Sequence, residues 1–328
     1  MQSVAEIPEH SFQRKAALAY GGVRDYAGKV EVQPIPNFDL DRTIFNTLEG
    51  MLPRFVIRTR IAKEAEWSSQ SQAEIQAGYQ SARANHVLPT VSDALMRFLV
   101  EGCDFDVEHA DGSFLDHLYF CYEYTHLHYP NRSPLVMLLH SILGTGTNTF
   151  AMEASKIPTL KSLMSDEDWR HVEAFPSVLR LLYDLKLRGE LREAKGRFES
   201  LESVDLYRVI DNAPIQMTAS DFWVQLNYQL IHLIDFLPVS NWGAHANDTA
   251  FIVFRDLYDL LSSSGRLEFG LSYESETRTG VIGEEQSFAA KLVDLIPVTL
   301  SERMAAKSVR RFSAQIGHCM DYRLNWET

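Results

Sequence analysis

The stretch SFLDHLYFCYEYTHLHYPNRSPLVMLLHSILG, which runs from residue 113 to residue 144, predicts two helices joined by a short turn. Ser113 is a suitable N-cap, and the chain then continues without glycine or proline as far as Pro130. A serine followed by a proline at 133–134 begins the second helix in the favoured order, and Gly144 ends it. We therefore expect a helical hairpin in this part of the chain.

Helical spacing of apolar residues recurs on both sides of this hairpin, which predicts an all-α fold. The expected further helices cover residues 39–52, 68–84, 91–100, 166–174, 177–190, 220–236, 248–263, 282–295 and 301–320. Only residues 29–32 and 267–273 show a pattern typical of short strands. The simplest division is an N-terminal extension, residues 1–38, followed by a single helical domain, residues 39–328.

The composition is that of a globular protein with a large core. Of the 328 residues, 45% are hydrophobic, and a chain of this length buries roughly 75% of its unfolded surface.

The net charge of −13 repels phosphate backbones and anionic lipids, so we expect neither nucleic acid nor a membrane as a partner. The sequence shows no spanning apolar run and no signal-peptide pattern, which predicts a cytoplasmic protein. Its three cysteines are too scattered for a disulfide framework.

Five of the eleven histidines lie between residues 109 and 140. On the first helix of the hairpin, four side chains advance by four, three and four residues and so share one stripe: His117, Cys121, Tyr124 and His128. His117 and His128 lie roughly 16 Å apart along the helix axis, which is too far for one metal ion. One site can therefore use only one of these two histidines.

His140 follows five apolar residues in a helix that we expect to be buried, so both of its ring nitrogens need partners. Such a partner can be a metal ion or a backbone carbonyl, and for a lone histidine the carbonyl is the more usual. In this chain the hairpin brings His117 onto a neighbouring helix, and His109 lies one loop upstream. The three imidazoles together form a candidate metal site.

Four further side chains are candidates for contacts with a small molecule. The loop 144–149 offers backbone N–H groups and the hydroxyl of Thr145, although an ordinary helix stop explains the loop as well. Trp223 and Asn227 share one face of an apolar helix, so the amide of Asn227 should point inward and need partners. Tyr124 lies on the histidine stripe and, with Thr145 and Trp223, is expected to line the substrate site.

The run HADGSFLDH at residues 109–117, followed by LLHSILGT at residues 138–145, resembles the HD-like helical superfamily. The similarity is greatest to a branch in which His-Ser-x-x-Gly-Thr replaces the usual His-Asp pair. The resemblance implies an all-helical bundle with a core at about residues 105–240. The superfamily includes metal-dependent phosphohydrolases and di-iron oxygenases of the inositol-oxygenase type. By position, His117 and His140 match its two histidine ligands.

The chain departs from this family pattern at two acidic positions. Ser141 stands where the aspartate of the His-Asp pair is expected, and Asn227 stands where the resemblance implies a late-helix aspartate. Without these carboxylates, the resemblance implies one ion held mainly by neutral imidazoles, with His109 as the third ligand. Nitrogen donors favour Fe(II) or Zn(II) over Mg(II).

Three hypotheses remain open. The first is a mononuclear metalloenzyme with an ion at His109, His117 and His140, acting on a small molecule as an oxygenase with iron or a hydrolase with zinc. The second is a metal-free enzyme or binding protein in which His140, Ser141 and Asn227 act by hydrogen bonding and proton transfer. The third is a non-enzymatic scaffold. A homo-oligomer is compatible with all three.

Overall fold

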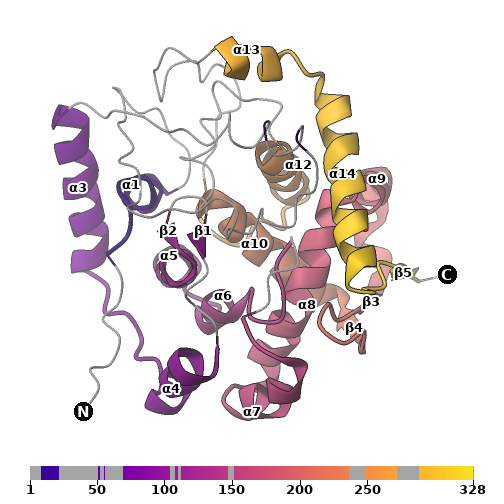
Figure 1. Cartoon of the computed structure of the whole chain (residues 1–328), viewed down its shortest axis with the longest axis horizontal. Helices are drawn as coiled ribbons and strands as arrows, with labels where there is room; N and C mark the ends of the chain where they lie inside the picture. Colours follow the sequence, from indigo (N-terminus) through magenta and orange to yellow (C-terminus); the bar gives the residue numbers. More distant parts are fainter. Residues whose placement is uncertain are drawn as a thin grey trace.

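The computed structural model describes residues 9–21, 51, 55, 69–103, 108–109, 112–146, 151–235, 249–271 and 288–327. This part of the chain is mostly helical, with one small three-stranded sheet, and the helices surround one hydrophobic core (Figure 1). The strand expected at 29–32 and the helix expected at 39–52, except for residue 51, lie outside the described residues. No helix among the described segments is long and apolar enough to cross a membrane.

The predicted hairpin consists of α5 (Phe114–His128) and α6 (Leu135–Leu139). Helix α6 is shorter than expected because the chain passes into turns after Leu139, where the Gly144 amide donates to the carbonyl of Ser141 at 3.1 Å. Its apolar residues from Val136 onward are nevertheless fully buried, as the five-residue apolar run predicts. The hairpin therefore places its second arm inside the core.

Helix α10 (Ala219–Asp235) packs against α5, α8 (Asp166–Tyr183) and α12 (Thr249–Ser263). It is buried from Phe222 to Asp235 without interruption, including its polar residues. A helix that is buried on all sides belongs in the interior of the protein, and its polar side chains must find partners there. Helix α10 is thus the central element around which the others are arranged (Figure 1).

Two expected helices at 166–174 and 177–190 are divided differently in the structure. Helix α8 continues through Pro176, and the break falls at Asp184, before α9 (Leu185–Glu193). Proline costs an internal hydrogen bond, but Phe175, Pro176 and the residues after them are buried in the core. Tertiary burial offsets the local penalty at this position.

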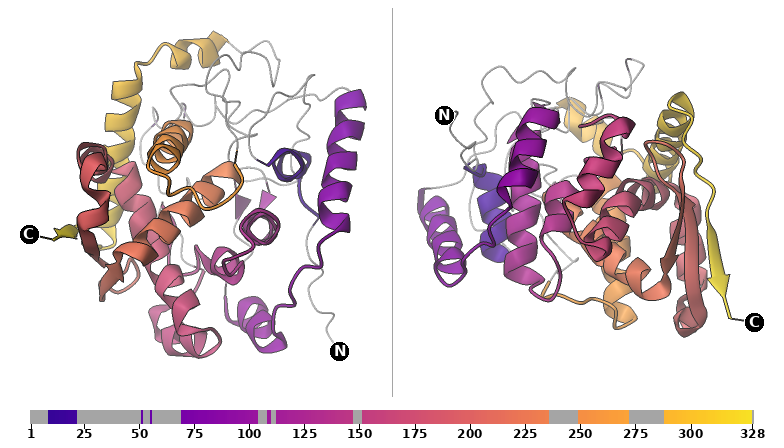
Figure 2. Two further views of the ribbon diagram at one scale, coloured as in Figure 1. Left: turned by 180° about the vertical axis from the view of Figure 1, so that it is seen from behind. Right: turned by 90° about the horizontal axis from the view of Figure 1, so that it is seen from below.

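The three-stranded sheet is the main departure from the predicted all-α fold. Strand β3 (Leu201–Tyr207) pairs antiparallel with β4 (Pro214–Thr218) and with β5 (Arg323–Trp326), in the order β4-β3-β5. The sheet lies at one end of the molecule beside the C-terminus (Figure 2). No strand was expected in these segments, whereas residues 267–271, which have strand-like sequence, form none.

Helix α1 (Phe12–Tyr20) lies within the stretch that the sequence predicts as an extension with at most one short strand. The hydroxyl of Ser11 caps it by accepting from the Arg14 amide, and Gly21 ends it in the left-handed region at φ +62°. Ala16, Ala17 and Leu18 are buried against the body of the protein. This segment is therefore a packed helix that contributes to the core.

The other described elements complete the frame around these helices. Helix α3 lies beside α1, and α14 lies along α8 and α9 (Figure 1). The bounds of these remaining elements are β1 (Glu108–His109), β2 (Gly112–Ser113), α3 (Ser69–Ala84), α4 (Asp93–Gly102), α7 (Ile157–Ser162), α13 (Phe288–Asp294) and α14 (Val298–Gln315).

We predict that His318 makes the fold sensitive to acid. Its ring is 6% exposed, its Nε2 lies 3.1 Å from the carbonyl of Tyr207, and burial lowers its pKa to about 4. The unfolded chain, in which a histidine has a pKa of about 6.5, binds a proton that the folded chain does not. The stability contributed by neutral His318 is therefore complete above about pH 6.5 and is lost as the pH falls toward 4.

Urea denaturation at about pH 7.5 and about pH 5 measures this effect. When the pH is lowered from the first value to the second, the free energy of unfolding should fall by about 2 kcal/mol less in His318→Gln than in the wild type, because glutamine does not titrate. Equal losses in the two proteins would contradict the assignment.

Candidate metal centre

Two histidines from different arms of the hairpin meet in the core. The Nε2 atoms of His117, on α5, and His140, directly after α6, lie 3.0 Å apart. Both residues are fully buried. The structure thus brings together the two imidazoles that the sequence analysis assigned to one site.

The Nδ1 atoms of both rings each lie beside a hydrogen-bond acceptor. The Nδ1 of His140 lies 2.6 Å from the carbonyl oxygen of Met137, and the Nδ1 of His117 contacts the carboxylate of Asp235. A carbonyl and an ionised carboxylate only accept hydrogen bonds, so each Nδ1 carries the proton. Each Nε2 then has a lone pair, and these two lone pairs face each other.

A metal ion placed between the two Nε2 atoms could take both lone pairs. Burial lowers the pKa of His140 to about 4. Burial, with the nearby charges of His140 and Arg14, holds the pKa of His117 well below its usual value. A proton is therefore a poor bridge at neutral pH, whereas a metal ion that takes both lone pairs satisfies the pair.

Cys121 supplies a third potential donor. It lies one turn after His117 on α5, and its Sγ is 4.0 Å from the Nδ1 of His117. Among the described residues, potential ligand atoms of His117, Cys121 and His140 all lie within 4.8 Å of one another, and all three residues are buried. Burial, reinforced by Asp235, raises the pKa of the Cys121 thiol, so the metal-free site holds a neutral thiol. This group could hold a metal ion.

A third imidazole forms a wall of the centre. The ring centroid of His232, on α10, lies 5.2 Å from that of His117 and 4.8 Å from that of His140, with the planes near perpendicular. Phe175 lies beside both of these rings, with its centroid 4.7 Å from that of His140 and 5.5 Å from that of His232. The surroundings of the two Nε2 atoms are thus aromatic and closely packed.

A buried ionic cluster lies directly behind His117. Arg14 of α1 donates from Nε to Asp235 at 2.6 Å and contacts Asp116 through Nη1. His10 lies 3.2 Å from Asp116 through Nδ1 and 2.6 Å from Glu123 through Nε2. Burial raises the pKa of Asp235, and the charge and hydrogen bonds of Arg14 oppose that rise. We call these five residues the Arg14 cluster.

The structure places Asn227 and Trp223 in a different environment. The Asn227 amide donates to the carbonyls of Trp223 and Arg266, both at 2.9 Å, and its oxygen accepts from the Glu268 amide at 2.9 Å. The Trp223 ring packs against Phe198, with centroids 4.8 Å apart, and under the Arg266 guanidinium. The buried Asn227 amide therefore finds its partners in the backbone.

The other predicted site residues are distributed around the hairpin. Ser141 is buried next to His140. Tyr124 is buried with its ring tilted against that of His128, 4.3 Å between centroids. The carbonyl of Thr145 accepts from the Arg180 guanidinium at 2.9 and 3.1 Å, so this part of the loop presents an oxygen to a cation. His109 lies in β1, and its side chain is outside the described part of the structure.

Sequence reasoning missed Asp235 and Arg14 as members of the centre. Asp235 is the last residue of α10, the late helix on which the family resemblance implies an aspartate. The sequence analysis expects that position at Asn227, two turns earlier on the same helix. A charged residue ending an otherwise apolar helix is the signal that could have pointed to Asp235. Cys121 was recognised on the His117 stripe but not assigned as a ligand.

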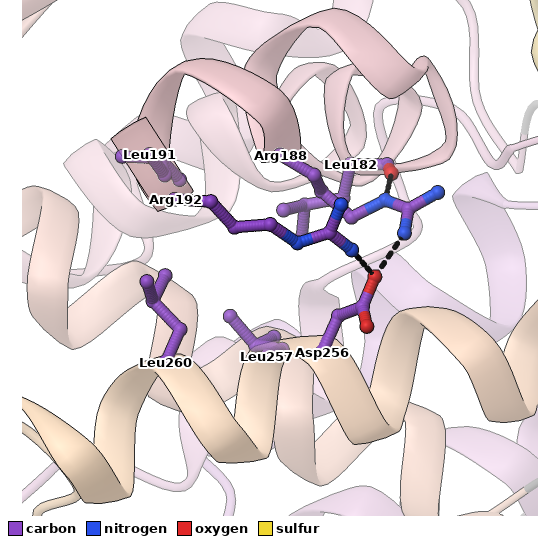
Figure 3. A pocket seen from close by; sticks show the side chains of 7 residues that line it. All are labelled: Leu182, Arg188, Leu191, Arg192, Asp256, Leu257 and Leu260. Atoms are coloured by element: carbon purple, nitrogen blue, oxygen red, sulfur yellow. Dashed lines mark hydrogen bonds and ion pairs between the residues drawn. The ribbon is translucent and has the colours of Figure 1, made fainter. Parts of the chain in front are cut away.

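A small pocket lies elsewhere, between α9 and α12 (Figure 3). Its polar lining consists of Arg188, Arg192 and Asp256, and both arginines contact the Asp256 carboxylate. Arg188 also donates to Glu302 at 3.0 Å. These charges pair with one another. The pocket is therefore a weaker candidate for a functional site than the group around His117.

Comparison of the chain with models of protein families, with curated proteins and with solved structures finds no match. The geometry of the centre is therefore the basis for its interpretation.

We predict that Asp235→Leu destabilises the protein by about 3 kcal/mol, because it leaves the buried Arg14 guanidinium with one carboxylate fewer. The loss of stability in the double variant Arg14→Met/Asp235→Leu should be smaller than the sum of the losses in Arg14→Met and in Asp235→Leu, since each single substitution already removes the contact between the two side chains. Urea denaturation of the four proteins measures the coupling. Additive effects of the two substitutions would show that the pair does not interact.

Proposed function

We propose that the protein is a metal-dependent enzyme that holds one transition-metal ion at His117 and His140 and acts on a small molecule. The observation that carries the proposal is the close approach of the two Nε2 atoms, 3.0 Å apart, with each Nδ1 beside a fixed acceptor. Ligating histidines characteristically donate their other N–H to a carboxylate or a backbone carbonyl. Both acceptors of that kind are present here, one for each ring.

The donor set fits zinc best. Imidazole suits both iron and zinc, but the thiol of Cys121 adds a soft donor that favours zinc. Three protein donors leave one position for water, and zinc bound in this way lowers the pKa of that water and acts as a Lewis acid. We therefore propose a hydrolase, with an iron-dependent oxygenase as the alternative that metal analysis distinguishes.

The chain's own residues hold the centre in one arrangement. Asp235 fixes the orientation and tautomer of His117, and the carbonyl of Met137 does the same for His140. Burial of both rings keeps bulk water away, which strengthens electrostatic interactions within the site. We propose the HD-like superfamily as the family, and an aspartate on late helix α10, Asp235, that contacts His117 supports this proposal.

We predict that the purified, untagged protein contains close to one equivalent of zinc, measured by elemental mass spectrometry. His117→Ala and His140→Ala should reduce the metal content to near zero, because each removes one of two facing donors. His126→Ala is the matched control, since His126 lies on the same helix but outside the described ligand group.

Three outcomes of this measurement decide among the hypotheses. One equivalent of iron in place of zinc would replace the hydrolase with the oxygenase. Wild-type protein that stays metal-free after incubation with either ion would contradict the proposal and favour the metal-free enzyme or the scaffold. Retention of metal by both His117→Ala and His140→Ala would place the ion elsewhere.

A second prediction concerns the third ligand. Protein loaded with Co²⁺ should show a thiolate-to-cobalt charge-transfer band in the near ultraviolet, because metal binding displaces the proton of the Cys121 thiol. Cys121→Ser should abolish the band and weaken zinc binding at least tenfold, on the order of the loss that removal of an outer-shell partner causes. His109→Ala should leave the band unchanged. Loss of metal in His109→Ala, with normal binding in Cys121→Ser, would assign the third position to His109.

A further inference from the structure

Helix α1 is joined to the candidate centre by one side chain. Arg14 is 0% exposed, and its guanidinium reaches both oxygens of Asp235, from Nε to Oδ1 at 2.6 Å and from Nη2 to Oδ2 at 3.2 Å. A two-point contact of this kind fixes the plane of the carboxylate, which a single contact to a lysine ammonium would not. Arg14 therefore determines how Asp235 is turned.

The orientation of Asp235 is passed on to His117. The oxygen that accepts from Arg14 Nη2, Oδ2, is the same oxygen that contacts the Nδ1 of His117. The opposite nitrogen of that imidazole faces His140. A continuous series of hydrogen bonds thus runs from α1 through the end of α10 to the proposed metal ligand on α5. Displacing the guanidinium would release the carboxylate that holds the ring.

Other contacts hold α1 in the position that this series requires. His10, just before the helix, lies between Asp116 and Glu123, so each of its ring nitrogens faces a carboxylate. Figures 1 and 2 show α1 between α3 and α5. If α1 moved away, Asp116 and Asp235 would lose the guanidinium between them, and buried carboxylates that lose a cation are strongly destabilising.

We propose that Arg14 is a positioning residue for the metal centre, and that docking of α1 and binding of the metal ion stabilise each other. This inference rests on the proposed function, because it concerns the same ion. The mutual effect follows from linkage: if docked α1 increases the affinity for metal by some factor, bound metal favours docking by the same factor. The N-terminal segment then acts as a structural part of the site.

The experiment compares zinc affinities by competition with a chromophoric chelator. Arg14→Gln and Arg14→Lys should bind zinc roughly tenfold more weakly than the wild type, the lower end of the effect of an outer-shell change. Arg83→Gln is the matched control, because Arg83 contacts Glu123 at the edge of the same cluster and is 45% exposed. It should bind like the wild type. Circular dichroism establishes that each variant is folded.

A second measurement uses the wild type alone and so does not depend on the folding of a variant. Amide hydrogen exchange in residues 12–20 should slow on addition of zinc, because metal binding favours the docked helix. In the metal-free protein, Arg14→Lys should also shift the nitrogen resonance of the His117 Nδ1, since the carboxylate beside it turns.

The outcomes separate this inference from the proposed function. If the Arg14 variants bind zinc as tightly as the wild type, and zinc leaves amide exchange in residues 12–20 unchanged, the coupling is overturned and the metal centre stands. Absence of zinc binding by the wild type would overturn the proposed function and the coupling with it. An equal loss of affinity in Arg83→Gln would show a general effect of the cluster's charge and would overturn the specific role of Arg14.

Discussion

Burial of carboxylates in an apolar core is the constraint on which the centre depends. Asp116 and Asp235 lie on different helices and are 5% and 1% exposed, and removing an ion of this size from water costs several kcal/mol after relaxation. The fully buried guanidinium of Arg14, which contacts both, offsets this cost. Because the charges must be paired, α1, α5 and α10 have to meet at one place. The position of His117 beside that meeting point follows from the same requirement.

The helical frame explains why two lone pairs can be held so close together. His117 is in the first turns of α5 and His140 directly follows α6, so both backbones are fixed by packed helices. Asp235 and the Met137 carbonyl then fix the tautomers from opposite sides. A flexible surface pair of histidines would turn its lone pairs toward water. Here the apolar walls, which include Phe175, prevent that relaxation.

The sequence predicts local features well and long-range pairings poorly. The hairpin, α3, α4, α10 and α12 fall close to their expected ranges because apolar spacing and caps are local signals. The meeting of His117 and His140 follows from the hairpin alone. By contrast, Val204 pairs with Leu324 in the sheet and Asp235 pairs with His117, and each pairing joins residues more than a hundred positions apart. Periodicity carries no information about such partners, so the sheet and the orienting carboxylate were not predicted.

The charge balance around the centre indicates what kind of ligand it would accept. Each ring nitrogen of His10 faces a carboxylate. His10, Arg14 and Arg83 lie against three carboxylates, Asp116, Glu123 and Asp235. A divalent ion bound by neutral imidazoles and one thiolate leaves an excess positive charge in a site of low polarity. Under the proposed function, that excess favours a substrate with an anionic group at the reacting end and disfavours a cationic one.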